Sequence, residues 1–298
     1  MSTFFILVKR NVKLFFKDKG MFFTALITPG ILLVLYATFL SNVYRDSFLA
    51  GLPQGVTLSG SVMNGLVAGQ LTSSLLSVSC ITVAFCSNFL MVQDKASGKY
   101  NDFLVSPVNQ TVTTLAYYTA TLLSTLIVCY TATAICLCYT GIVGWYLSAI
   151  DVICLFLDVT LLVFFGTAFS SLINVFLSSQ GQISAVGTIV SAGYGFICGA
   201  YMPISTFSKG LQKVLSFFPG TYGTAILRTH ATNGVFSEMQ NTGMPEEAVT
   251  QMKGLLDCEP SFFGTVVSPT AMYLILAGSV ALLVTATVLL YSCKKKSK

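Results

Sequence analysis

Few residues of this 298-residue chain could take part in covalent chemistry or hold a metal ion. Gly98 and Lys99 do not form a phosphate-binding loop, because no glycine stands five residues before Gly98 and no Ser or Thr follows Lys99. The single histidine, His230, cannot build a two-histidine metal site, and we expect it to be a surface residue at the outer interface. We find no serine nucleophile elbow and no pair of carboxylates within one apolar run. The sequence therefore predicts a protein that is not an enzyme and that binds no ATP, metal or other cofactor itself.

Asp158 is the one carboxylate well inside a long apolar run, about seven residues or about 10 Å from the outer end of the expected helix. Acidic residues within a membrane usually face protein or water and mark a transport path. The alternative is a packing carboxylate near the membrane surface that bonds to a neighbouring hydroxyl group. Glycines pose a similar choice, because they can line a path or allow helices to pack closely. The candidate path residues are Asp158, Gly65, Gly69, Gly195 and Gly199.

The composition is that of an integral membrane protein. Hydrophobic residues make up 54% of the chain and charged residues 9%, whereas soluble domains carry about 25% charged residues. The apolar runs are about 20 residues long and do not alternate with polar residues, which favours helices over a membrane β-barrel. Nucleic-acid binding is not indicated. Most of the nine cysteines lie in apolar runs, where they behave as small hydrophobic residues, and Cys258 alone lies in a polar region, so no disulfide framework is predicted.

We expect an all-α polytopic membrane protein with six transmembrane helices in a single membrane domain. The first 20 residues form an interfacial helix, because apolar residues from Phe4 to Phe15 share one face opposite basic residues. The expected spans are residues 21–44, 61–92, 110–142, 152–177, 183–202 and 270–292. The expected connections are a polar loop at residues 93–109, an outer segment at residues 203–268 and a basic tail at residues 293–298.

The distribution of Lys and Arg indicates which ends of the helices face the cytoplasm. Eleven of the sixteen basic residues lie near the N-terminus, in the 93–109 loop or in the C-terminal tail. Basic residues gather on the cytoplasmic side of membrane proteins. We therefore expect a multi-pass protein of the cell membrane with both termini and the 93–109 loop in the cytoplasm, and with the acidic segment 231–268 outside.

The 93–109 loop, QDKASGKYNDFLVSPVN, is the only internal break that combines charges of both signs, a glycine and a closing proline. We expect it to lie in water against a polar surface. A second unusual segment follows the fifth expected span. There, Phe207 and Leu211 share an apolar helix face opposite lysines, and Pro219 interrupts the helix. We expect this segment to be interfacial or re-entrant.

Two segments resemble the permease subunit of type-2 ATP-binding-cassette (ABC) exporters. Residues 199–228 resemble the family's outer signature, with small residues, a proline, an amphipathic helix, a second proline beside an aromatic residue and a closing arginine. The family's cytoplasmic coupling segment is similar to Gly98, Tyr100, Phe103, Leu104, Val105, Ser106, Pro107 and Val108. Lys99 and Asn101 stand where the family usually has threonine and often has glutamate, so we expect them to encode partner specificity. The short loop after the first span resembles the multidrug-resistance and antimicrobial-peptide branch.

The resemblance implies a half-transporter. Two permease chains, identical or homologous, would pair in the lipid bilayer, two ABC ATPase subunits carrying ATP and Mg²⁺ would dock beneath them, and the substrate would pass between the permeases. It implies export of an amphipathic compound such as a drug, an antimicrobial peptide or a lipid-linked molecule. The alternatives are a polysaccharide or ion exporter of the same family, or an ATP-independent channel or secondary carrier that uses Asp158.

In this interpretation the 93–109 loop is a coupling helix. Its expected apolar contacts are Phe103 and Leu104, and its expected polar rim is Asp94, Lys95, Lys99 and Asp102. The full set of expected coupling residues is Asp94, Lys95, Gly98, Lys99, Tyr100, Asp102, Phe103, Leu104 and Pro107. The expected outer re-entrant helices are marked by Pro203, Phe207, Leu211, Pro219, Tyr222 and Arg228.

Overall fold

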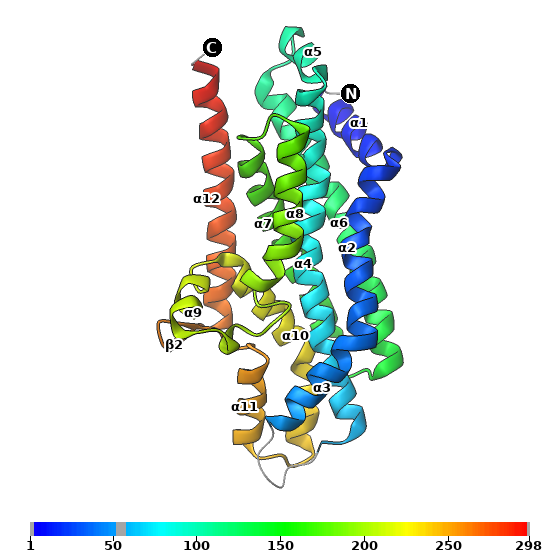
Figure 1. The fold of residues 1–298 in the computed structure, drawn as a ribbon, viewed down its shortest axis with the longest axis vertical. Coiled ribbons are helices and arrows are strands. Elements are labelled where there is room, and N and C mark those ends of the chain that lie inside the picture. The colour runs from blue at the N-terminus through cyan, green and yellow to red at the C-terminus, as the bar shows by residue number, and fades with distance from the viewer. Residues whose placement is uncertain (1–2, 52–57, 297–298) are drawn as a thin grey trace.

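The computed structural model describes residues 3–51 and 58–296 and shows an elongated bundle of helices (Figure 1). In chain order the helices are α1 (Thr3–Lys17), α2 (Lys19–Leu35), α3 (Ser41–Ala50), α4 (Gly60–Ala96), α5 (Lys99–Val105), α6 (Gln110–Val143), α7 (Ala149–Asn174), α8 (Gln180–Ile197), α9 (Lys209–Leu215), α10 (Pro219–Asn241), α11 (Glu246–Leu255) and α12 (Pro269–Lys296). The remaining elements are a π-helical turn (Tyr36–Leu40), a 3₁₀ turn (Ile204–Thr206) and an antiparallel hairpin of β1 (Ser261–Phe262) and β2 (Thr265–Val266).

Helix α4 is the centre of the bundle, and the other long helices pack around it (Figure 1). Its 37 residues give it a length of about 55 Å. Gly, Ala, Ser and Thr make up much of its sequence, so neighbouring helices approach it closely along most of its length. At Gly69, for example, an added Cβ atom would lie 2.7 Å from the carbonyl oxygen of Ala231 in α10. The hydrophobic core therefore follows α4, between α6, α7 and α10.

Within the described part of the chain, five helical stretches are long and apolar enough to cross a membrane. They are Ala25–Ala50, Gly60–Ala96, Gln110–Val143, Ala149–Asn174 and Pro269–Leu290. These stretches confirm an all-α polytopic membrane protein, and they match the expected spans one to four and six. Helix α8 occupies the place of the expected span 183–202 but ends at Ile197, because the chain turns at Gly199 with a φ of 74°. The fifth of the six expected spans stays a prediction.

Several helix ends differ from those expected from the sequence. Helix α7 begins at Ala149 rather than at residue 152, because a capping box between Ser148 and Asp151 starts the helix earlier. Helix α4 continues to Ala96, past the expected end at residue 92. Helix α10 continues past residue 231 to Asn241 and packs on α4 and α7. The acidic segment expected at residues 231–268 therefore begins within a largely buried helix.

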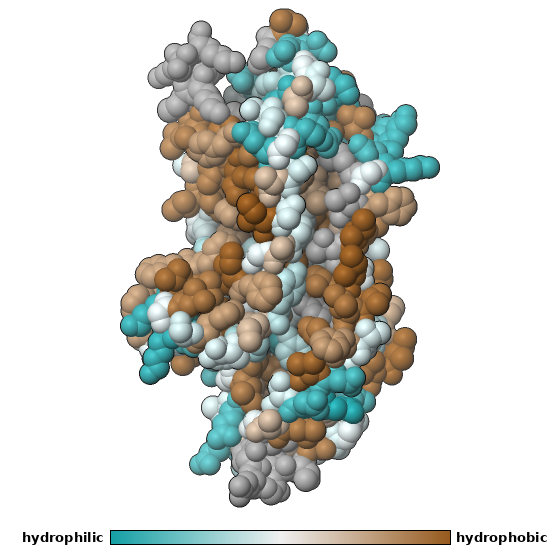
Figure 2. Space-filling view, in the orientation of Figure 1, coloured by the Kyte–Doolittle hydropathy of each residue, from teal (hydrophilic) through white to brown (hydrophobic). Residues whose placement is uncertain are grey.

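Both termini and α5 lie at one end of the bundle, and α3 and α11 lie at the opposite end (Figure 1). Figure 2 shows hydrophilic residues gathered near α5 and α1 and apolar residues over much of the long sides. Helix α1 packs against α6 through Leu7 and Val8, while Lys9 and Lys13 on its other face are exposed. The end that carries α5 is therefore polar and basic.

Candidate functional site

The local sequence determines the form of α5. Gly98 is its N-cap and has a φ of 79°, a conformation that glycine adopts without strain. At the other end, Pro107 has no backbone N–H and favours the extended backbone that Ser106 adopts after α5. Asn109 then caps α6 by accepting a hydrogen bond of 3.0 Å from the backbone N–H of Thr111. Turns on both sides thus isolate α5 as a short helix at the end of the bundle.

Asp94 lies in the last turn of α4 and is buried, with 4% of its surface exposed. The Tyr117 hydroxyl of α6 donates a hydrogen bond of 2.6 Å to its Oδ2 atom. The Arg10 Nη1 atom of α1 lies 3.1 Å from the same oxygen and forms a salt bridge with it. A buried carboxylate needs such partners, because an unpaired charge away from water is costly. Asp94 therefore joins α4 to both α1 and α6.

Two aromatic residues hold α5 against this ion pair. The Phe103 ring lies 6.5 Å from the Tyr117 ring in an edge-to-face arrangement, and the Arg10 guanidinium lies 5.3 Å from the centre of the Phe103 ring. The Tyr100 ring lies 6.4 Å from both of these rings. Each contact of this kind contributes about 0.5–1.5 kcal/mol. The inner side of α5 is therefore attached to the residues that bind Asp94.

Lys95, the residue after Asp94, makes contact with α7. Its Nζ atom donates a hydrogen bond of 3.4 Å to the carbonyl oxygen of Asn174 at the end of α7, where helical carbonyls lack partners within the helix. The Asn174 amide donates to the Asn88 carbonyl at 2.9 Å. The Asn88 amide donates to the hydroxyls of Ser170 and Ser171 at 2.9 and 2.8 Å. Polar bonds thus fasten the end of α4 to α7.

We call these residues the coupling junction: Arg10, Asp94, Lys95, Tyr100, Phe103, Tyr117 and Asn174. Asp94 and Lys95 are consecutive, yet Asp94 binds α1 and α6 whereas Lys95 binds α7. Because α5 packs on the same aromatic rings, a displacement of α5 would act on α1 and α6 through direct ring contacts, and on α7 only through Lys95 of α4.

The placement of Asp94 and Phe103 corrects an expectation from the sequence. Asp94 is buried and cannot belong to an exposed polar rim. Phe103 is half-buried, because its ring packs edge-to-face against the Tyr117 ring of α6. Among the described side chains of α5, the most exposed large apolar one is instead Val105, of which 86% is exposed.

The other expected coupling residues divide into an inner and an outer group. Lys99, Asp102 and Pro107 are exposed. Tyr100 is buried within the junction. The side chain of Leu104 lies outside the described part of the chain. Their roles in binding a partner stay predictions.

Sequence reasoning missed Arg10, Tyr117 and Asn174. All three are separated from Asp94 or Lys95 by at least 23 residues, and each belongs to a different helix. One signal in the sequence indicates that Asp94 has a partner. A carboxylate at the end of an apolar run needs a nearby cation if it is buried. Arg10 meets that requirement, because it lies beside the buried face of α1 whereas Lys9 is exposed.

An open groove of about 810 Å³ lies between α2 and α8, with α4 as its floor. Its apolar lining includes Ile31 and Leu32 of α2, Phe89 of α4 and Ile183 of α8. In Figure 2 a paler band of intermediate hydropathy runs down the middle of the view, where α8 lies, between brown apolar surfaces, and Ser184, Thr188 and Ser191 of α8 line the groove. The groove therefore combines an apolar wall with a helix face that carries hydroxyl groups.

The groove becomes polar toward α5. Asp18, Gln93 and Gln180 line it there, and the same three residues line a second hollow of about 790 Å³. Lys17 and Lys99 also line that second hollow. A continuous surface thus leads from charged groups beside α5 to apolar groups along the bundle.

Asp158 does not line this groove in the described structure but joins its own helix, α7, to two others. Its Oδ2 atom lies 2.6 Å from Nδ1 of His230 in α10, and its Oδ1 atom accepts a hydrogen bond from the Tyr273 hydroxyl of α12. The side chain of Asp158 is 1% exposed. His230 is therefore half-buried and paired, which corrects the expectation of a surface histidine, because α7 and α10 bring the two groups together.

The environment of His230 changes its affinity for protons. Burial lowers the pKa of His230, but the hydrogen bond that protonated His230 donates to Asp158 and the charges of Asp158 and Asp151 outweigh burial, so its pKa is raised above 6.5. Asp151 lies on the same face of α7 and accepts a hydrogen bond of 2.9 Å from the Asn233 amide of α10. Two acidic residues of α7 thus contact α10.

The four candidate path glycines lie at close contacts. An added Cβ atom at Gly65 would lie 2.7 Å from the Tyr146 ring, and α10 closely approaches Gly69. At Gly195 the Tyr201 ring occupies the equivalent space. Gly199 forms the turn after α8. These contacts explain the glycines by packing, and within the described residues a different glycine, Gly187, lines the groove.

Arg228 joins several segments in the half of the molecule opposite α5. It is fully buried in α10, and its guanidinium donates hydrogen bonds to the carbonyls of Leu256 at 2.6 Å and Gly199 at 2.8 Å. Asp257 accepts a hydrogen bond from the backbone N–H of Ile204. Burial raises the pKa of the Asp257 carboxyl, and the charge of Arg228 only partly offsets this. Together the two residues hold the turn after α8 against α10 and the end of α11.

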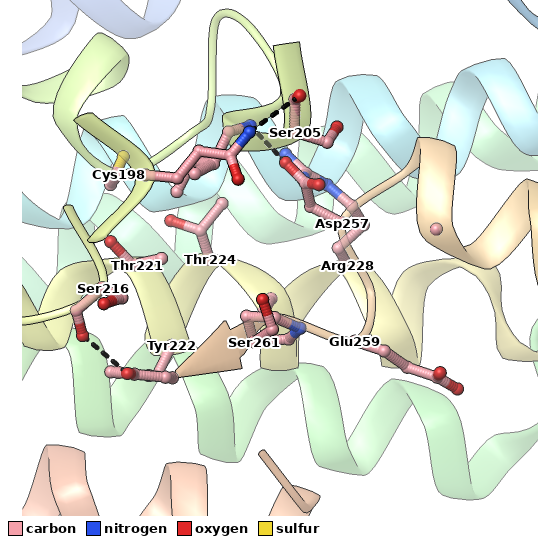
Figure 3. Close-up of a pocket in the computed structure, with 15 residues that line it drawn as sticks. Cys198, Ser205, Ser216, Thr221, Tyr222, Thr224, Arg228, Asp257, Glu259 and Ser261 are labelled. Atoms are coloured by element: carbon pink, nitrogen blue, oxygen red, sulfur yellow. Dashed lines mark hydrogen bonds between the residues drawn. The ribbon is translucent and has the colours of Figure 1, made fainter. Parts of the chain in front are cut away.

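A polar cavity of about 170 Å³ lies beside this pair. Figure 3 shows Ser205, Thr221, Thr224, Arg228 and Asp257 around it.

The other expected outer residues lie at the 3₁₀ turn, on or beside α9 and at the start of α10. Pro219 is the first residue of α10, and Pro203 precedes the 3₁₀ turn. The Tyr222 hydroxyl donates a hydrogen bond of 2.6 Å to the Ser216 carbonyl. Phe207 is half-buried and Leu211 is exposed on α9.

A bundle of membrane-length helices, with both termini and a short helix at one end, defines a multi-pass membrane protein. The model of the family described as "ABC-2 type transporter" matches residues 2–230. The chain belongs to this family, and it is the permease component of an ABC transporter rather than its catalytic subunit. Permeases of this family work with ABC ATPase subunits. None of the curated proteins compared with the chain matches it.

Proposed function

We propose that this chain is one of two permeases in an exporter that moves an amphipathic substrate out of the cell. Two ABC ATPase subunits hydrolyse ATP beneath the permeases and act on α5. In this arrangement both termini are cytoplasmic and the protein lies in the cell membrane. The observation that carries the proposal is the coupling junction, which connects an exposed helix to the helices that a transport cycle must move.

The junction supports energy input from a partner. The outer face of α5 carries Lys99, Asp102 and Val105, which suits a binding surface with an apolar centre and a charged rim. Its inner face packs on Tyr117 and Arg10. A partner that holds α5 differently with and without ATP would shift the bundle between two states.

The groove supports an amphipathic substrate. Apolar residues such as Ile31 and Phe89 can bind an aliphatic or aromatic part, while Gln93 and Gln180 can bind a polar group near α5. Exposed apolar residues flank the groove, including Ile27 on α2 and Phe196 on α8. A second permease placed over this face would enclose the groove, so that the substrate passes between the two chains.

Drugs, amphipathic peptides and lipid-linked compounds all fit this description. A polysaccharide or ion exporter of the same family is the alternative, and the apolar wall of the groove favours an amphipathic substrate over either. A secondary carrier based on Asp158 is less well supported, because both of its oxygens are engaged by His230 and Tyr273.

Transport in proteoliposomes tests the proposal. The chain is reconstituted with an ABC ATPase from the same genome, and uptake into inside-out vesicles is measured for ethidium, a short-chain fluorescent phospholipid and a cationic amphipathic peptide. We expect ATP-dependent uptake of at least one probe. Gly187→Trp should abolish uptake, because an added Cβ atom already lies 3.3 Å from Phe89 across the groove. Gly278→Trp on α12, where an added Cβ atom meets nothing within 4 Å, should leave uptake unchanged.

Two results would reject the proposal. ATP-independent flux of protons or ions through the chain alone would favour a carrier. Normal uptake with Gly187→Trp would show that the substrate does not use the groove.

A further inference from the structure

A patch of apolar side chains protrudes from the half of the molecule opposite α5. Helix α9 and its C-terminal turn contribute Leu211, Val214 and Phe217, and the hairpin and its turn contribute Phe262, Phe263 and Val266. All six are exposed, Phe217 at 65% and Phe263 at 57%. We call these six residues the aromatic patch.

The three phenylalanine rings of the patch contact one another. The Phe217 ring lies 5.3 Å from that of Phe262 and 5.7 Å from that of Phe263, and the latter two are 4.9 Å apart. Two elements separated by 45 residues of chain therefore present one shared apolar surface. A contiguous surface of this kind, unlike single exposed apolar residues, marks a binding site.

The backbone at the tip of the hairpin is strained. Phe263 and Gly264 form its two-residue turn, with φ angles of 49° and 90°. Turns with positive φ at both positions favour Asn-Gly or Asp-Gly, because a large side chain is strained there. A phenylalanine at this position therefore indicates that its ring is needed there for a contact, and that this need outweighs the preference of the turn for Asn or Asp.

The position of the patch identifies what covers it. The membrane-length helix α12 begins at Pro269, three residues after Val266. In Figure 1, α9 and β2 project sideways from the bundle beside the first turns of α12. The patch therefore lies at the level where a membrane span enters the bilayer, so lipid is the neighbour at that point.

The charges around the patch suit a phospholipid surface. Lys209 and Lys213 on α9 are exposed, and Lys213 Nζ lies 5.6 Å from the centre of the Phe263 ring. Lysines can bury their aliphatic stems among apolar groups while their ammonium groups reach phosphates. Glu259, which is also exposed, stands at the base of the hairpin, away from its tip.

We propose that α9 and the β1–β2 hairpin insert the aromatic patch into the leaflet at the α12 entry point, with Phe263 deepest and Lys209 and Lys213 at the phosphates. The hairpin lies beyond residue 230, where the family match ends. This anchor depends only on α12 crossing the membrane. It does not depend on the substrate, the direction or the energy source of transport.

Tryptophan fluorescence in liposomes tests the insertion. The single tryptophan is first removed by Trp145→Phe, and Phe263→Trp is then introduced as the reporter in phosphatidylcholine with brominated acyl chains. Leu282→Trp on the exposed lipid-facing side of α12 is the positive control, and Thr250→Trp on the exposed face of α11 is the aqueous control. We expect bromine to quench Phe263→Trp about as strongly as Leu282→Trp, and iodide to quench only Thr250→Trp. Quenching of Phe263→Trp by iodide and not by bromine would overturn the proposal.

A second variant separates insertion from hairpin stability. Phe263→Asn places a favoured residue in the turn, so a hairpin held only by its own turn should become more stable. Under our proposal the variant loses its lipid contact, and residues 261–266 should exchange their amide hydrogens several-fold faster in nanodiscs. Equal or slower exchange in Phe263→Asn would contradict the proposal.

Discussion

Tyr117 of α6 donates a hydrogen bond of 2.6 Å to Asp94 in the last turn of α4. Arg10 of α1 contacts both Tyr117 and Asp94, so each of the helices α1, α4 and α6 is bonded to the other two at this point. Because Phe103 of α5 packs on the Tyr117 ring, the same tyrosine serves the polar bond and the aromatic contact.

Removing that hydroxyl should weaken coupling. Tyr117→Phe keeps the ring against Phe103 but removes one of the two partners of the buried Asp94 carboxylate. Hydrogen bonds to charged groups contribute about 1.5–3 kcal/mol, so the free energy of unfolding should fall by that amount. Substrate-stimulated ATP hydrolysis by the assembled complex should fall as well. Denaturant unfolding and ATPase assays measure the two effects.

Tyr118→Phe is the control, because it removes the same atom from the next residue. It should preserve both the free energy of unfolding and the stimulated ATP hydrolysis. Equal losses in the two variants would argue against a role of the coupling junction.

The Asp158–His230 pair should make stability depend on pH. The pKa of His230 is raised in the folded chain, so protonated His230 stabilises the fold below its ordinary pKa of about 6.5. That contribution is lost as the pH rises through the raised pKa. The melting temperature of the purified protein should therefore fall as the pH rises from slightly acid to alkaline values. In His230→Gln this fall should be absent, and a fall of the same size would assign the pH dependence to other groups.

Arg228 should be essential for the fold of the outer half. Arg228→Met leaves the carbonyls of Gly199 and Leu256 without their donors. Each unsatisfied buried acceptor costs about 1–3 kcal/mol, so the unfolding free energy should fall by an amount of that order or larger. Arg45→Met is the matched control, because Arg45 is exposed and its loss should change stability by about 0.5 kcal/mol or less. Chemical denaturation compares the two variants, and equal stabilities would contradict the role of Arg228.

The sequence predicts where the helices of this fold lie along the chain better than which helices contact one another. Long apolar runs identify the first four spans and the last, and Gly98 and Pro107 delimit α5, because these signals are local. Helix α10 is harder to predict, since residues such as Thr224 and Thr232 lower its hydropathy although both are buried.

The partners of the functional residues depend on tertiary packing. His230 lies 72 residues from Asp158, and no periodicity in either segment indicates that the two helices meet there. The same reason explains why Asp94 could be identified as a charged residue of interest but not as a buried one. Its partners, Arg10 and Tyr117, come from two other helices.

In the proposed mechanism the outer face of α5 binds the ATPase, while its inner face transmits the motion to the bundle. Val105→Asp tests this division of roles, because Val105 is 86% exposed and lies outside the coupling junction. Ile142→Asp is the control, since Ile142 is 87% exposed at the far end of α6. Binding of the ABC ATPase to each purified variant is measured together with stimulated ATP hydrolysis. We predict binding weakened about tenfold or more, and loss of stimulation, for Val105→Asp, with an unchanged melting temperature and a normal Ile142→Asp. Wild-type binding and stimulation in Val105→Asp would show that the outer face of α5 does not bind the ATPase.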